Sequence, residues 1–133
     1  MQRRFQQFVL VGIFLTAIIE SFAWFYVPTD PVQADLYFAD GYGALVEGSY
    51  IVYFSILAIR VLIMIGLLSF HRTARTLFLI FVPLTALSAV LWGFRVSAPI
   101  VGPFYYLESV IDGIIFALAF YSSVSVKFSE GAT

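Results

Sequence analysis

Two carboxylates lie four residues apart in an otherwise apolar and aromatic segment. Glu108 and Asp112 interrupt the run at 104–121. A spacing of four residues places both side chains on one face of a helix. If that helix crosses a membrane, the two charges are costly and need partners or a purpose. Carboxylates in such a setting serve ion networks that hold a bundle together, or they serve proton-coupled transport.

The composition of the chain indicates an integral membrane protein. Of its 133 residues, 62% are hydrophobic and only 11% are charged. A soluble domain carries about 25% charged residues, so this chain lacks the polar surface that water requires. The net charge of −1 is uninformative about nucleic acid, but no basic patch is present to hold phosphates, so we expect no nucleic acid as a partner.

Metal and cofactor chemistry finds few suitable ligands in the sequence. There is no cysteine, which excludes disulfides and cysteine-ligated metal. The single histidine, His71, excludes bis-histidine haem ligation within the chain. We therefore expect no metal and no cofactor.

Four apolar segments have the length that a membrane-spanning helix needs. They lie at 8–27, 48–70, 76–95 and 104–126, and Pro83 is expected to kink the third. The fold class predicted is an all-α integral membrane protein, a four-transmembrane-helix bundle that forms a single domain at residues 1–133. The first segment, preceded by two arginines, also suits a cleaved signal peptide. It is expected to stay attached, because the apolar run resumes at Phe22.

The charges outside the spans predict the orientation. The basic side chains that fall on one side of a four-span chain, together with His71, are Arg3, Arg4, Arg72, Arg75 and Lys127. The acidic loop 28–47 falls on the other side, with Arg95 at its boundary. By the positive-inside rule both termini are cytoplasmic. A bacterial inner membrane is the expected location.

The loop 28–47 is predicted to contain a short interfacial helix. Asp30 suits an N-cap, Pro31 suits the first helical position and Gly41 suits a stop. A calcium loop is an alternative, but the spacing of the aspartates is not that of an EF-hand. An acidic solvated loop is the simpler alternative.

Each predicted span carries polar residues at helical spacing, which indicates a bundle with a partly polar interior. The residues that form the candidate buried polar or ligand site are Glu20, Tyr53, Arg60, Trp92, Arg95, Tyr105, Glu108 and Asp112. A stripe of small residues on the fourth span, Ser109, Gly113 and Ala117, predicts a helix-packing seam.

Helical rise predicts which of these charges meet. At 1.5 Å per residue, Glu20, Arg60 and Asp112 lie about 10, 16 and 12 Å below the outer boundary. We expect these three to meet in one layer, with Asp112 paired to Arg60. Arg95 and Glu108 are expected to form a second layer nearer the surface.

The acids outnumber the arginines in this predicted network by three to two. Arginine stays protonated, whereas a desolvated carboxyl can take up a proton. The surplus carboxyl therefore either belongs to a structural network or marks a proton or ligand site. The sequence leaves both alternatives open.

Three functional hypotheses follow. The first is a small polytopic membrane protein that acts through association, as a homo-oligomer or as an accessory subunit of a larger membrane protein. It rests on the expectation that four helices leave little room for a substrate cavity. The second is a small transporter or channel for a proton, an ion or a polar solute that uses Glu20, Arg60 and Asp112. The third is an outward-facing binding or sensing module built on the loop 28–47. An enzyme is not expected, because no serine–histidine or zinc motif is present.

Overall fold

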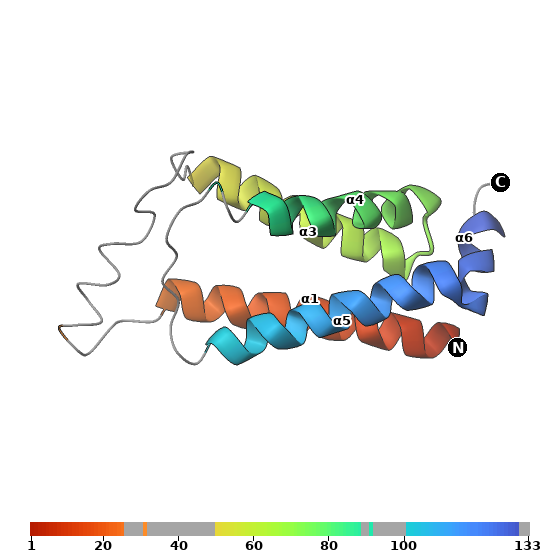
Figure 1. Cartoon of the computed structure of the whole chain (residues 1–133), viewed down its shortest axis with the longest axis horizontal. Helices are drawn as coiled ribbons and strands as arrows, with labels where there is room; N and C mark the ends of the chain where they lie inside the picture. The colour runs from red at the N-terminus through yellow and green to blue at the C-terminus, as the bar shows by residue number, and fades with distance from the viewer. Residues whose placement is uncertain (26–30, 32–49, 89–90, 92–100, 131–133) are drawn as a thin grey trace.

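The structure, a computed structural model, is helical and describes residues 1–25, 31, 50–88, 91 and 101–130 (Figure 1). Its long helices are α1 (Gln2–Phe25), α3 (Tyr50–Leu68), α4 (Arg72–Ser88) and α5 (Val101–Tyr121). The short 3₁₀ helix η2 (Ser123–Val126) and the short helix α6 (Lys127–Glu130) follow α5.

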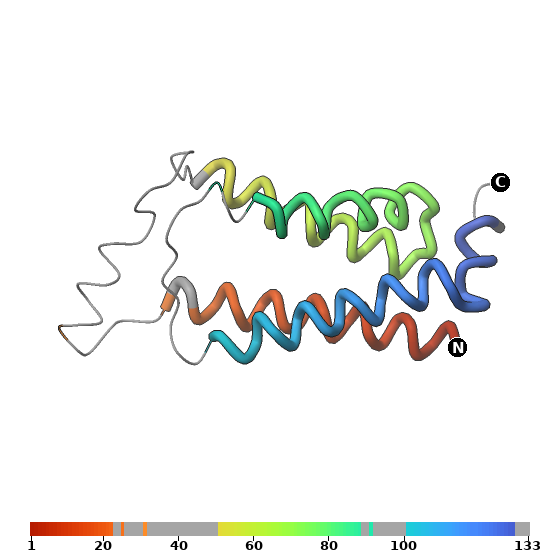
Figure 2. Tube along the Cα trace, in the orientation of Figure 1, coloured from red at the N-terminus to blue at the C-terminus, as the bar shows by residue number. Residues whose placement is uncertain are grey.

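The long helices associate as two pairs. α1 packs chiefly on α5, and α3 packs chiefly on α4. The two pairs lie side by side, with the N-terminus, the turn between α3 and α4, and α6 at one end (Figures 1 and 2). The basic residues near the N-terminus, in the first turn of α4 and at the start of α6 therefore share that end.

In the described part of the chain, three helices are long and apolar enough to cross a membrane: Gln2–Phe22, Ile51–Leu68 and Val101–Tyr121. This finding confirms the all-helical class and indicates a membrane protein. Helix α1 begins at Gln2, earlier than the predicted span, because nothing in the basic head breaks a helix. Helix α4 continues through Pro83 and has 17 residues. The predicted interfacial helix lies outside the described residues, apart from residue 31.

The turn between α3 and α4 ends α3 in an unusual way. Phe70 adopts a left-handed conformation with φ of 56°. Its N–H donates to the Leu67 carbonyl at 3.1 Å, and the His71 N–H donates to the Gly66 carbonyl at 2.9 Å. These two bonds form a Schellman motif, in which glycine normally takes the left-handed position. A phenylalanine there must be held by contacts elsewhere.

Those contacts come from an aromatic cluster at the same end of the molecule. The Phe70 ring lies 5.6 Å from the ring of Phe5 on α1 and 5.5 Å from that of Phe128 on α6. Phe5 and Phe128 are fully buried and meet edge to face. The Arg75 guanidinium covers the Phe128 ring at 5.4 Å. The cluster ties the first helix, the turn and the C-terminal helix together.

Helices α3 and α4 approach each other closely at a contact between two small residues next to the turn. A Cβ built on Gly66 would lie 2.5 Å from the Ala74 Cβ. Any larger residue at Gly66 would force the helices apart. Close backbone approach of this kind is how helices associate in lipid, where the hydrophobic effect does not drive their contact.

The strain at Phe70 can be tested with two truncations. Phe70→Ala and Phe70→Gly both remove the ring, so both should be less stable than the wild type. The glycine variant should be the more stable of the two by about 1 kcal/mol, because glycine adopts the left-handed conformation without steric cost. Unfolding in detergent measures the difference. An alanine variant as stable as the glycine variant would contradict the strained turn.

Candidate functional site

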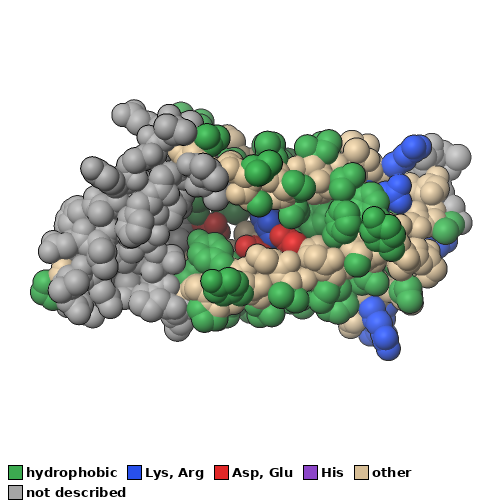
Figure 3. Space-filling view, in the orientation of Figure 1, with side chains coloured by type: hydrophobic (Ala, Val, Ile, Leu, Met, Phe, Trp, Pro, Cys, Tyr) green, Lys and Arg blue, Asp and Glu red, His purple; other side chains and the backbone are tan. Residues whose placement is uncertain are grey.

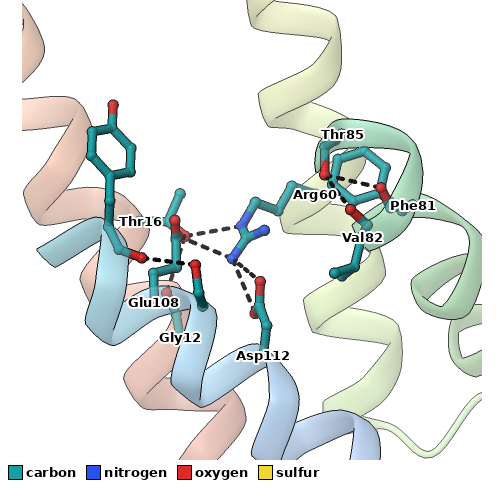
Figure 4. A network of polar contacts seen from close by, with 10 residues as sticks. Gly12, Thr16, Arg60, Phe81, Val82, Thr85, Glu108 and Asp112 are labelled. Carbon is teal, nitrogen blue, oxygen red and sulfur yellow. Dashed lines mark hydrogen bonds and ion pairs between the residues drawn. The ribbon is translucent and has the colours of Figure 1, made fainter. Parts of the chain in front are cut away.

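Arg60 extends from α3 across the interior and contacts side chains of two other helices (Figure 4). Its Nη2 atom lies 3.1 and 3.0 Å from the two oxygens of Asp112 on α5. The same nitrogen lies 3.0 Å from Oε1 of Glu108, one turn earlier on α5. Its Nε donates to Oγ1 of Thr16 on α1 at 3.2 Å. One guanidinium therefore links three of the long helices.

Thr16 completes this cluster from the α1 side. Its hydroxyl lies 2.6 Å from Oε1 of Glu108 and 3.1 Å from the carbonyl of Gly12. A hydroxyl has one proton to donate and two lone pairs that accept. The shorter contact and the carboxylate charge favour donation to Glu108, while Thr16 accepts from Arg60. The threonine thus joins the acid to the base.

Glu20 lies apart from the Arg60 cluster. Tyr53 on α3 donates its hydroxyl hydrogen to Oε2 of the Glu20 carboxylate. Within residues 1–25, 50–88 and 101–130, ion pairs within 4 Å are formed by Arg60 with Glu108 and with Asp112. In this part of the chain Glu20 therefore has a neutral hydrogen-bond donor and no cation at ion-pair distance.

A cavity of about 830 Å³ adjoins both groups. Residues of all four long helices line it, among them Thr16, Glu20, Tyr53, Arg60, Thr85, Tyr105, Glu108 and Asp112. Figure 3 shows acidic and basic side chains inside a hollow between the two helix pairs. The side chains of Arg60, Glu108 and Asp112 keep relative exposures of 15%, 16% and 9%. The cluster is thus nearly buried but reachable from the cavity.

The structure arranges the predicted residues differently from the two expected layers. Arg60 and Asp112 do come together. Glu108 also pairs with Arg60, because the two carboxylates lie one turn apart on α5 and both reach Nη2 of the guanidinium. The layer expected for Glu108 and Arg95 is not tested, because Arg95 lies outside the described residues. Glu20, expected beside Arg60, contacts Tyr53.

Of the three predicted site residues not yet described, one lies at the cavity and two lie outside the described part of the chain. Tyr105 lines the cavity. Trp92 and Arg95 lie outside the described residues.

The sequence-based prediction missed two features of the site and was wrong about a third. Thr16 was not included among the site residues, although it lies four residues before Glu20 at helical spacing. The cavity itself was not expected. The predicted small-residue seam is wrong at Gly113, which lines the cavity and where an added Cβ would meet no atom of the described residues within 4 Å.

The chemistry available in the cavity is that of carboxylates, hydroxyls and one guanidinium. No group of three or more possible metal ligands is found among the described residues. Three acids and one arginine line the cavity there, which leaves an excess of negative charge. Such a site can bind a cation or take up a proton.

Comparison with known proteins gives no assignment. No protein-family model, curated protein or solved structure matches the chain. The function must therefore be argued from the site.

The role of Arg60 in stability can be tested by removing its partners in turn. Arg60→Ala leaves two nearly buried carboxylates without their cation and should cost about 3–5 kcal/mol. Arg60→Leu with Asp112→Leu should recover part of that loss. Adding Glu108→Gln should recover more, because the amide keeps a hydrogen bond with Thr16 and carries no charge. Unfolding in detergent measures each step. Wild-type stability in Arg60→Ala would contradict the network.

Proposed function

We propose that the protein is a small transporter that binds a polar solute, an ion or a proton in a cavity within its helix bundle. The observation that carries the proposal is the cavity of about 830 Å³ with its Arg60–carboxylate cluster. Ligand pockets in proteins measure about 300–1,000 Å³. The cavity is therefore large enough for a small ligand. The association hypothesis rested on the expectation that four helices leave little room for a substrate, and the cavity volume argues against that expectation.

The proposal includes four spans with both termini in the cytoplasm of a bacterial cell. The 17 residues of α4 extend about 26 Å, close to the ~30 Å of a hydrocarbon core. Helix α4 also runs alongside three helices that qualify as spans. The described basic residues other than Arg60 gather at one end of the molecule, and positive charge favours the cytoplasmic side.

Transport can be measured in proteoliposomes under a pH gradient and under a membrane potential. The wild type should carry an ion or proton flux above that of empty liposomes. Asp112→Asn should lower the flux at least about tenfold, because it removes one of the charges that face the cavity. The remaining Arg60–Glu108 pair should keep the variant folded.

Ser55→Ala provides the matched control. Ser55 is exposed, donates a hydrogen bond to the Ile51 carbonyl of its own helix and does not line the cavity. The flux through the Ser55→Ala variant should therefore equal that of the wild type. A flux that is equal in Asp112→Asn and the wild type would contradict the assignment. So would the absence of flux under both driving forces.

Association is a second candidate function, and one observation favours it. The Arg60 cluster lies in a hollow between the helix pairs rather than behind a complete wall (Figure 3). In hydrocarbon, charges beside such a hollow need cover other than lipid tails. A helix of a second copy or of another membrane protein would provide it.

The oligomeric state in mild detergent and in nanodiscs tests this candidate. Association through the hollow predicts a dimer or a larger complex that Val82→Trp, which fills the cavity wall, disrupts. A monomer that still carries flux would exclude it.

A further inference from the structure

We propose that the cavity binds an amphipathic organic cation, with Glu20 as the anion that holds it and the hollow between the helix pairs as its route from the bilayer. The inference rests on the proposed transport function and adds the class of substrate. It follows from the charges, the walls and the position of the cavity.

Among the described residues that line the cavity, the charges do not balance: three are acids and one is an arginine. Arg60 is shared by Glu108 and Asp112, so that cluster keeps one negative charge when both acids are ionised. Glu20 adds a second, with the Tyr53 hydroxyl as its contact in the described part of the chain. An uncompensated charge in a medium of low dielectric constant is costly. A bound cation would lower that cost, whereas an anion would raise it.

Glu20 is better placed than the two acids of α5 to receive the cation. Asp112 already makes two hydrogen bonds to the Arg60 guanidinium. Glu108 forms an ion pair with Arg60 and accepts a hydrogen bond from Thr16. A ligand at either acid would have to displace the guanidinium. At Glu20 it would meet a carboxylate bound by a tyrosine hydroxyl, and cations also bind favourably to aromatic faces.

The walls of the cavity fit an organic ligand better than a bare metal ion. Apolar and aromatic residues, Ile19, Ile56, Leu57, Phe81, Val82 and Phe116, form much of the lining. No cluster of three metal-ligating side chains occurs within the described ranges. Metal ions such as Ca²⁺ and Mg²⁺ prefer several oxygen ligands. A cation with an apolar body satisfies both the carboxylate and these walls.

The hollow suggests how such a ligand arrives. It lies along the helix pairs, on a side of the bundle that faces lipid if the helices cross a membrane (Figure 3). Exposed apolar side chains of α4 and α5, such as Leu84, Leu87, Leu107 and Val110, are suited to that lipid. An amphipathic cation concentrates in the bilayer interface and can reach the hollow from there.

Two ions of the same shape and opposite charge provide the test. Binding of tetraphenylphosphonium and of tetraphenylborate is measured by equilibrium dialysis against the full chain in nanodiscs, with empty nanodiscs as background. The phosphonium should bind saturably and the borate should not. Glu20→Gln should weaken phosphonium binding about tenfold or more while keeping an oxygen for the Tyr53 hydroxyl. Ser55→Ala, outside the cavity lining, should bind like the wild type.

The outcomes separate this inference from the transport proposal. Saturable borate binding, or phosphonium binding that is unchanged in Glu20→Gln, would overturn the cation site while transport of another solute stands. No saturable phosphonium binding together with an ion or proton flux in proteoliposomes would also overturn the inference alone. No binding of either probe and no flux would overturn both. A thermal unfolding scan of Glu20→Gln must match the wild type, and Glu20→Asp, which keeps the charge, must retain more binding than Glu20→Gln.

Discussion

The sharing of Arg60 between Glu108 and Asp112 is the interaction on which the interior of the bundle depends. A guanidinium cannot lose its charge in a protein, so its place inside the bundle requires carboxylates nearby. The two acids of α5 provide them, and Thr16 extends the contact to α1. Because Arg60 also donates to Thr16, the cluster joins three helices. Because one cation serves two acids, the cluster keeps an excess of negative charge when both acids are ionised. The residues that hold the three helices together therefore also contribute negative charge to the cavity lining.

The rest of the fold keeps this cluster accessible. Lipid removes the hydrophobic driving force between helices, so the helices must associate through close contacts. Gly66 and Ala74 provide one between α3 and α4, and the aromatic cluster of Phe5, Phe70 and Phe128 provides another at the end that holds the N-terminus. Both lie away from the cavity lining. The bundle is closed at that end, while the hollow remains between the pairs.

The sequence predicted the elements better than their assembly. Hydropathy and length located the apolar helices, and the similar depths of Arg60 and Asp112 predicted the pair that the structure brings together. Depth along the membrane could not show that Glu108 turns to the same guanidinium, because helix rotation and pairing decide which charges meet. The cavity was missed for a related reason. Gly113 has the pattern of a packing seam, and whether a small residue meets a neighbour or leaves a space depends on how the pairs are arranged.

We infer that the helix pairs form a solvent-reachable cavity whose described lining carries an excess of negative charge, and the absence of cysteine allows a direct measurement. Thr85→Cys places a thiol in the cavity lining, and Leu84→Cys places one on the exposed apolar face of the same helix. Labelling in proteoliposomes uses two membrane-impermeant methanethiosulfonates, one carrying trimethylammonium and one carrying sulfonate. We expect Thr85→Cys to react while Leu84→Cys does not. We also expect the cationic reagent to react faster than the anionic one, relative to their rates with a free thiol. An unreactive Thr85→Cys, or a preference for the anionic reagent, would contradict this inference.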